Sequence, residues 1–335
     1  MQKEKIDFVI IWVDGSDEEW QKVKREYQPN KDQDAAQNRY RDWENLKYWF
    51  RGVEKFAPWV NTIHFVTCGQ CPEWLNTNHP KLHMVDHKDY IPQEYLPTFS
   101  ANPIELNFHR IDGLSEQFVY FNDDFFIIDY VKEEDFFVDG KPKDMLMEYP
   151  IGCGGNNEVF SHLLANDFNL IGRHFQRSEI KKRLKKKILS PKYGKYAFYN
   201  WCMYHFPFPN FFGVLTPHFA QPYLKSSYAK VWEAEEEVLK NTCKNRFRSK
   251  DDVNSYVFRI WNLMEGNFVP DNRYKIGKAY FIRDEKTTLY EDMLAHKYKL
   301  ICINDDCSDE VYEEAKAKVN NIFEQILPDK SEFEL

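Results

Sequence analysis

The sequence contains no apolar run long enough to cross a bilayer. Its longest clean stretch covers only residues 8–13, far short of the roughly 18–20 residues that a membrane-spanning helix needs. It carries no GxGxxG, GxxxxGK[ST] or GxSxG motif, so the common dinucleotide, P-loop and hydrolase sites are not indicated. Glycine is scarce, at 13 of 335 residues. The chemistry of this chain must therefore come from another arrangement of side chains.

Neither a disulfide framework nor a basic charge over the whole surface is indicated by the composition. The seven cysteines are odd in number for so long a chain, which favours a reducing, cytoplasmic compartment. Cys68 and Cys71 form a CxxC, but no second pair follows at zinc-site spacing, so a metal or redox role is not favoured. The formal net charge of −8 argues against nucleic acid as a partner.

Strand patterns alternate with helical patterns along the chain. Residues 7–13 are apolar on both faces, which is typical of a parallel strand covered by helices. Further strand patterns occur at 62–67, 82–85, 117–121, 279–282 and 300–303, and helical patterns at 18–27, 43–57, 228–240, 253–263 and 309–326. We therefore expect an α/β fold with a largely parallel sheet and flanking helices.

Acidic residues follow three of the predicted strands. The clusters are Asp14-Gly15-Ser16-Asp17, Asn122-Asp123-Asp124 and Asn304-Asp305-Asp306. Ligands of open α/β sheets bind outside the carboxyl ends of the strands, and hard oxygen ligands suit Mg²⁺ or Mn²⁺. One such Asp is usually a turn residue or a helix cap, but three clusters together indicate a site for a metal and a diphosphate.

Phosphates held without a P-loop need cationic side chains. Arg39 lies close to Arg41, and Arg246 lies close to Arg248; guanidinium groups bind phosphate in a bidentate fork, although either pair alone also fits surface ion pairing. His218 lies in a proline-bounded turn, LTPHFAQPY. A lone histidine is more often structural, but it is the side chain best suited to accept a proton near neutral pH.

One segment differs from the rest in charge. Residues 177–187 carry seven cations and one Glu, and aromatic-rich sequence follows as far as residue 212. A solvated helix face with core aromatics explains this pattern as well as a landing surface for an anionic membrane or polymer does. Both interpretations stay open on the sequence.

These residues fall into four blocks that resemble the Stealth family of sugar-phosphate transferases, which includes bacterial capsule polymerases and the enzyme that tags lysosomal proteins with N-acetylglucosamine 1-phosphate. The first block is IDFVIIWVDGSDEEW, residues 6–20. The second runs from RYRDWENL at residue 39 to FVYFNDDFFI at residue 127. The third runs from His218 to Val253, and the fourth from CINDD, 302–306, to KSEFE, 330–334. The second block has TCGQCPEW where the family usually has TDGQVPEW, which removes one candidate acid.

The resemblance implies a fold of the nucleotide-sugar transferase type, Rossmann-like or GT-A-like, and a phosphotransferase reaction. Sugar 1-phosphate, with N-acetylhexosamine expected, would pass from a UDP-sugar to an oligo- or polysaccharide hydroxyl with Mg²⁺ or Mn²⁺ as cofactor, releasing UMP and forming a phosphodiester. The implied roles are metal binding for Asp123, Asp124, Asn304 and Asp305, catalysis for His218, Asp14 and Asp123, and substrate binding for Gly15, Arg39, Arg41, Arg246 and Arg248.

Organisation and location are further expectations. Residues 1–130 and 216–335 would form one catalytic domain, with 131–215 a variable insertion that contacts the acceptor or the membrane. The resemblance implies a bacterial enzyme of capsule or surface polysaccharide synthesis in the cytoplasm, peripheral on the inner face of the plasma membrane. Two alternatives stay open: a metal-dependent glycosyltransferase that releases UDP, and a non-catalytic carbohydrate-binding protein.

Overall fold

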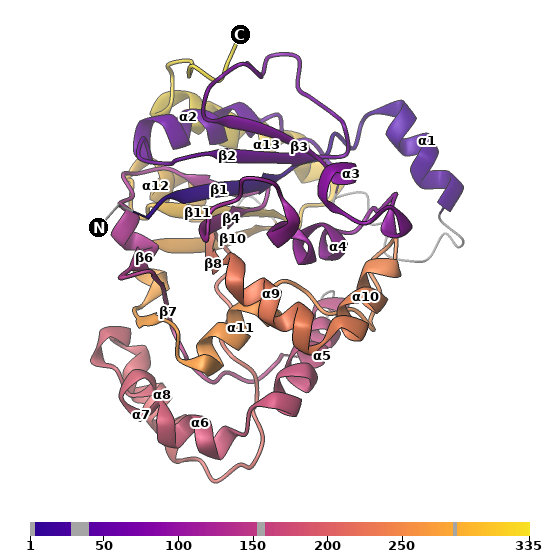
Figure 1. The fold of residues 1–335 in the computed structure, drawn as a ribbon. Helices are drawn as coiled ribbons and strands as arrows, with labels where there is room; N and C mark the ends of the chain where they lie inside the picture. The colour runs from indigo at the N-terminus through magenta and orange to yellow at the C-terminus, as the bar shows by residue number, and fades with distance from the viewer. Residues whose placement is uncertain (1–3, 28–39, 153–157, 284–286) are drawn as a thin grey trace.

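The computed structural model describes residues 4–27, 40–152, 158–283 and 287–335. Its central sheet has the strand order β3-β2-β1-β4-β8 (Figure 1). The first four strands pair in parallel, and β8 pairs antiparallel with β4. The bounds are β1 (Ile6–Ile11), β2 (Ile63–Thr67), β3 (Leu82–Asp86), β4 (Gln117–Phe121) and β8 (Gln221–Leu224). The expected α/β fold with a largely parallel sheet is confirmed.

Two smaller sheets extend this core. One has the order β10-β11-β5, and the other has the order β6-β7-β9. The chain passes from the central sheet to the first of these at residues 122–124, which join β4 to β5. The bounds are β5 (Phe125–Ile127), β6 (Phe137–Val138), β7 (Lys141–Asp144), β9 (Val269–Pro270), β10 (Gly277–Ile282) and β11 (Leu300–Asp305).

Helices cover both faces of the central sheet, and alternation along β1 shows the two layers. Phe8 and Ile10 belong to an apolar cluster with residues of α2 (Leu46–Phe56) and α13 (Asp309–Ile326). Val9 belongs to a second cluster with residues of α4 (Ala101–Leu106), α9 (Lys225–Ala234), α10 (Glu236–Lys244) and α11 (Tyr256–Glu265). A strand buried on both sides needs a nearly continuous apolar run, which β1 has except at Asp7, a buried carboxylate that accepts hydrogen bonds from Asn61 and Ser115 N.

The prediction of a single helix over 228–240 is wrong, because the chain forms α9 and α10 with a break at Glu235. The Glu235 carboxylate accepts hydrogen bonds from Arg173 and His174 of α5, so a tertiary contact fixes the break that local helix propensity does not encode. The other helices are α1 (Glu18–Tyr27), α3 (His87–Tyr90), α5 (Glu158–His174), α6 (Arg177–Arg183), α7 (Lys185–Ile188), α8 (Tyr196–His205) and α12 (Leu289–Leu294).

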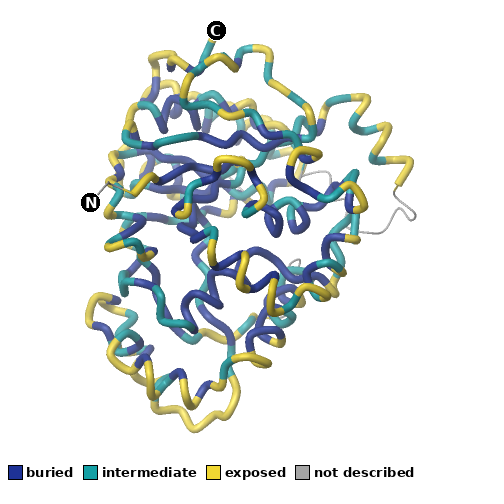
Figure 2. Tube along the Cα trace, in the orientation of Figure 1, coloured by how far each residue is buried: buried dark blue, intermediate teal, exposed yellow. Residues whose placement is uncertain are grey.

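Helices α6, α7 and α8 lie together at the end of the molecule far from the C terminus (Figure 1). Much of the outer chain there is exposed (Figure 2). We call α6–α8 and the segment that follows to residue 212 the helical lobe. Within the described residues, no helix combines the length and the apolar character needed to span a bilayer.

A buried ion pair ties the last residues of the chain to the core. Arg51 of α2 donates to both carboxylate oxygens of Glu334, over 2.8 and 2.9 Å, and to Leu327 O over 2.9 Å. The two side chains are only 6% and 5% exposed. Removing one member of such a pair leaves a buried charge without its partner, which typically costs about 3–5 kcal/mol.

We therefore expect Glu334→Gln to lower the free energy of unfolding by about 3 kcal/mol at pH 7. Burial alone would raise the pKa of Glu334, but hydrogen bonds from Arg51 lower it below its usual value. The stabilisation is thus present above the unfolded-state pKa of about 4.3 and is lost as the pH falls through the folded-state pKa. Urea unfolding at pH 7 and pH 3 tests this: the deficit should shrink at pH 3, and exposed Asp329→Asn should show none at either pH.

Candidate functional site

The carboxyl ends of β1 and β4 meet where the strand order of the sheet reverses. From β1 the chain proceeds to β2 and β3 on one side and returns to β4 on the other, an arrangement that opens a ligand crevice. Asp14 lies three residues beyond β1, and Asn122, Asp123 and Asp124 follow β4 directly. Two of the predicted acidic clusters therefore lie at one edge of the sheet.

The third cluster reaches this edge because β11 pairs antiparallel with β5, which places Cys302 opposite Phe125. Ile303 N donates to Asp124 O over 2.9 Å, and the Cys302 thiol donates to Asp124 Oδ2 over 3.2 Å. Farther along β11, Asn304 Nδ2 lies 3.5 Å from His218 Nε2. The structure therefore brings Asp124, Asn304 and His218 together.

His218 lies in a largely enclosed position with contacts on several sides. Its Nδ1 is 3.4 Å from the hydroxyl of Tyr256, and its ring meets the ring of Phe125 edge-on at 5.1 Å. Burial, and to a smaller degree the positive charge of Arg248, lower the pKa of His218 to about 4. The imidazole is therefore neutral at pH 7 and has one ring nitrogen available to accept a proton.

Four carboxylates form an anionic cluster around the end of β4. Burial raises the pKa of both Asp123 and Asp124, with a contribution from Asp42 at Asp123 and from Asp123 at Asp124. Burial also raises the pKa of Asp42, to which the charge of Asp14 contributes. Asp123 keeps solvent-exposed surface although the protein around its carboxylate raises its pKa, so the cluster can be reached by a charged ligand. Asp42 was not predicted, because it follows no strand.

These residues fit a hard divalent cation. Asp124 Oδ1 is buried and accepts no hydrogen bond from the described residues. Donor atoms of Asp124, His218 and Cys302 lie within 4.8 Å of one another. Burial and the neighbouring Asp124 raise the pKa of the Cys302 thiol far above its usual value, so the thiol stays protonated. The carboxylates of Asp123 and Asp124 are then the suitable hard donors, with the Asn304 amide nearby.

Asp305 and Arg41, predicted as a metal ligand and a phosphate contact, form an ion pair. Asp305 Oδ1 lies 3.5 Å from Arg41 Nη1, and Oδ2 accepts from Trp43 Nε1 over 3.3 Å. Arg41 also pairs with Asp309 and donates to Cys307 O. These contacts tie the start of the second block to the end of β11. The neighbouring Asp306 pairs with Arg283 over 2.6 Å.

The four predicted arginines differ in their surroundings. Arg248 Nε is buried and has no hydrogen-bond partner in the described parts of the chain, and its charge lies close enough to His218 to lower the pKa of that imidazole. Arg246 instead donates to Pro97 O over 2.6 Å and covers the ring of Tyr27 at 4.8 Å. Arg39 lies outside the described residues. Arg248 is therefore the arginine best placed to meet an anionic ligand.

Two residues, Tyr40 and Gln70, hold the loop that follows β1. A Cβ at Gly15 would lie 2.1 Å from Tyr40 O, so only glycine fits this close approach. Gln70 accepts from Asp14 N over 2.9 Å and donates to Asp14 O over 3.1 Å. Gln70 was not predicted as a site residue, although it lies in the block that the resemblance covers. The neighbouring Cys68 is a free thiol whose pKa burial raises to about 11.

A buried carboxylate beneath the site was also missed. Glu105 accepts a hydrogen bond from Tyr120 OH over 2.9 Å and another from Ser255. The Tyr120 hydroxyl also lies 2.5 Å from Asn122 Oδ1, and Arg248 contributes a favourable charge at Glu105. Glu105 therefore links the end of β4 to Ser255, which directly precedes α11. A single Glu in a short helix gives no sequence signal of such a role.

The chain matches a known protein family. Models of three conserved regions of Stealth proteins match the chain: region 1 at residues 4–32, region 2 at 39–144 and region 4 at 291–335.

Similar proteins match over nearly their whole length. A capsular polysaccharide phosphotransferase, WcwK of Streptococcus pneumoniae, is 41% identical over 99% of this chain and 98% of its own. The receptor polysaccharide phosphotransferase WefC of Streptococcus gordonii is 39% identical over 99% of both chains. The exopolysaccharide phosphotransferase cps2G of Lactiplantibacillus plantarum is 38% identical over 98% of this chain and 96% of its own.

Proposed function

The chain belongs to the Stealth family, and from this premise and the site geometry we propose that it transfers a sugar 1-phosphate from a UDP-sugar to a hydroxyl of an oligo- or polysaccharide acceptor. It is a polysaccharide phosphotransferase of capsule or exopolysaccharide synthesis. The expected transferred group is N-acetylhexosamine 1-phosphate. The observation that carries the proposal is the meeting of Asp124, Asn304 and His218 at the switch point of the sheet.

The proposed reaction forms one P–O bond and breaks another. The acceptor oxygen attacks the phosphorus that bears the sugar, and the bond from this phosphorus to the oxygen bridging the two phosphates breaks. UMP leaves with that oxygen, and the sugar phosphate becomes a phosphodiester. The hydroxyl proton would pass to the neutral imidazole of His218; the support for this role is that the imidazole lies beside Asp124 and Asn304.

The other residues bind and orient the substrates in this proposal. Asp14 and Gly15, in the loop held by Gln70, would position the nucleotide or the sugar. Arg248 would contact the diphosphate through its unpaired Nε. Arg41, which is paired with Asp305, would be a further phosphate contact. Arg39 and Arg246 stay predicted phosphate contacts. Asp123, an exposed member of the cluster, would take part in catalysis as well as in metal binding.

A divalent cation fits the same cluster. Asp123 and Asp124 would hold Mg²⁺ or Mn²⁺, with Asn304 and Asp305 in its immediate surroundings. A cation bound there would offset the charge of the diphosphate and of the leaving phosphate. The support from the structure is that Asp124 Oδ1 is buried without a partner among the described residues, and that the charge of Asp123 contributes to the raised pKa of Asp124, as that of Asp42 does at Asp123.

We also propose the division of labour along the chain and its location. Residues 1–130 and 216–335 would carry the catalysis, and 131–215 the acceptor or membrane contacts. A cytoplasmic location at the inner face of the plasma membrane agrees with the six cysteines of the described residues, all of which are free thiols.

The nucleotide product distinguishes this reaction from that of a glycosyltransferase with the same acidic cluster. With UDP-N-acetylglucosamine labelled at the β-phosphorus, Mg²⁺ and an oligosaccharide acceptor, we expect UMP as the product and the label in the acceptor. A panel of other UDP-sugars, run in parallel, identifies the donor. Label recovered in UDP would instead establish bond cleavage at the anomeric carbon and overturn the proposed transfer.

A further inference from the structure

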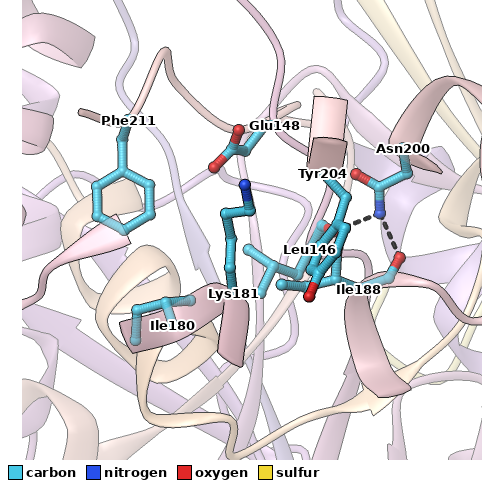
Figure 3. Close-up of a pocket in the computed structure, with 8 residues that line it drawn as sticks. All are labelled: Leu146, Glu148, Ile180, Lys181, Ile188, Asn200, Tyr204 and Phe211. Atoms are coloured by element: carbon cyan, nitrogen blue, oxygen red, sulfur yellow. Dashed lines mark hydrogen bonds between the residues drawn. The ribbon is translucent and has the colours of Figure 1, made fainter. Parts of the chain in front are cut away.

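The helical lobe is a firmly held element, although it lies far from the central sheet (Figure 1). Arg177 forms a bidentate pair with Glu148 and donates to the carbonyls of Met203, Phe206 and Phe208. Asn200 of α8 donates to the carbonyls of Leu146 and Ile188 (Figure 3). These bonds fix α6, α7 and α8 to residues 146–148, so the outer surface of the lobe has a defined shape.

Besides Arg177 and the half-buried Lys181, the lysines and arginines of the lobe fall into two groups. Arg183 donates to the carbonyls of Met264 and Glu265, and Lys187 to those of Gly266 and Phe268. These two cations satisfy carbonyl groups at and beyond the end of α11 and have a structural role. The second group is exposed and comprises Lys182, Lys185, Lys186, Lys192 and Lys195.

Large apolar side chains are exposed on the same lobe. Phe198 is 74% exposed, and Trp201 and Phe206 are each 51% exposed. Phe208 in the following segment is 43% exposed. Helix α8 is rich in aromatic residues, yet Asn200 is its only buried residue. Phe198 stacks on Trp201 with ring centroids 6.2 Å apart, and Phe206 and Phe208 both contact the ring of Phe212; exposed aromatic residues in such number on one lobe indicate a surface that a partner covers. We call Phe198, Trp201, Phe206 and Phe208 the aromatic surface.

We infer that the helical lobe docks on the surface of an anionic lipid bilayer, with the aromatic surface at the level of the headgroups and the exposed lysines against anionic lipids. A bilayer interface takes both kinds of residue, because aromatic rings favour the boundary region and lysines are attracted to negative headgroups. Sugar rings can also stack on exposed aromatic side chains, so an anionic glycan is the competing occupant, and the arm of the test with a soluble polysaccharide distinguishes it from a bilayer. A second copy of the chain would bring like charges together.

Docking of the lobe would affect the candidate site, because the two are close in the chain. Tyr149 N donates to Gly213 O, and Leu215 N donates to Met147 O, so the two ends of the segment that contains the lobe pair with each other. His218 follows only three residues after Leu215. Docking of the lobe would therefore hold the candidate site at a fixed orientation to the bilayer. This consequence rests on the proposed function, but the docking itself does not.

Flotation with vesicles tests the docking. We expect binding to vesicles that contain about one third phosphatidylglycerol, and little binding to pure phosphatidylcholine. Each exposed lysine should contribute about fivefold to the partition coefficient at low salt. The triple variant Lys182→Gln, Lys185→Gln, Lys186→Gln should thus bind about 100-fold more weakly, and the difference should shrink at high salt. The matched control changes Lys22, Lys240 and Lys318, which lie on other helices, to Gln.

The aromatic surface needs a separate variant. Phe198→Ser with Trp201→Ser should lower vesicle binding at least tenfold at any salt concentration, whereas exposed Phe281→Ser on β10 should leave it unchanged. Transfer to a short soluble acceptor should survive in all these variants, which separates a failure of docking from a failure of the proposed reaction. Equal vesicle binding by the wild-type chain and either lobe variant would overturn the inference, as would wild-type binding to a soluble anionic polysaccharide but not to vesicles.

Discussion

Replacing Asp124 by Asn is expected to lower kcat by at least about 1,000-fold. The substitution keeps the shape of the side chain and removes one negative charge from the position best suited to a hard cation. It also relieves the repulsion from Asp123, which contributes to the raised pKa of Asp124. The free energy of unfolding should therefore stay equal to that of the wild-type chain or rise. A loss of activity without a loss of stability is the result that a purely structural carboxylate would not give.

A neighbouring acid provides the control for Asp124. Asp306 also follows β11, but its carboxylate pairs with Arg283 over 2.6 Å, and Asp306→Asn should leave kcat within about threefold of the wild-type value. Chelation should abolish transfer by the wild-type chain, and Mg²⁺ or Mn²⁺ should restore it. Full activity in excess chelator would exclude the cation from the proposal, and full activity of Asp124→Asn would exclude this carboxylate as its ligand.

The fold could be predicted from the sequence wherever a local pattern decides the structure. The apolar run of β1 and the three- and four-residue spacing in α2 and α13 are such patterns, because burial on a sheet or along a helix face selects residues at fixed steps. The break at Glu235 could not be predicted, since it depends on Arg173 and His174, about 60 positions away.

The residues of the candidate site could likewise be predicted only where a local pattern marks them. Acids at the ends of strands could be recognised because the carboxyl ends of parallel strands meet at one edge of a sheet. Asp42 and Glu105 could not be recognised, because their places depend on long-range packing and neither follows a strand. The same limit applies to the basic segment, where charge alone could not separate Lys187, which caps the end of α11, from exposed Lys186.

The second large effect on kcat is expected for the replacement of His218. An acceptor hydroxyl is a poor nucleophile at neutral pH, and a positioned base typically contributes about 10²–10⁴-fold. His218→Ala should therefore lower kcat by at least about 100-fold and leave the KM for the UDP-sugar little changed, because the loss concerns the transition state rather than donor binding. The label at the β-phosphorus should still be transferred to the acceptor, only more slowly.

Tyr256→Phe is the matched variant for His218. Its hydroxyl lies 3.4 Å from His218 Nδ1, so removing it alters the orientation of the imidazole without removing the base, and the loss in kcat should be about tenfold or less. The test compares the losses in kcat of the two variants. A base requires a much larger loss for His218→Ala than for Tyr256→Phe, whereas a histidine that only fills space would give losses of similar size. If His218→Ala transfers sugar phosphate at the wild-type rate, the proton must be taken by Asp14 or Asp123, the carboxylates that remain at the switch point.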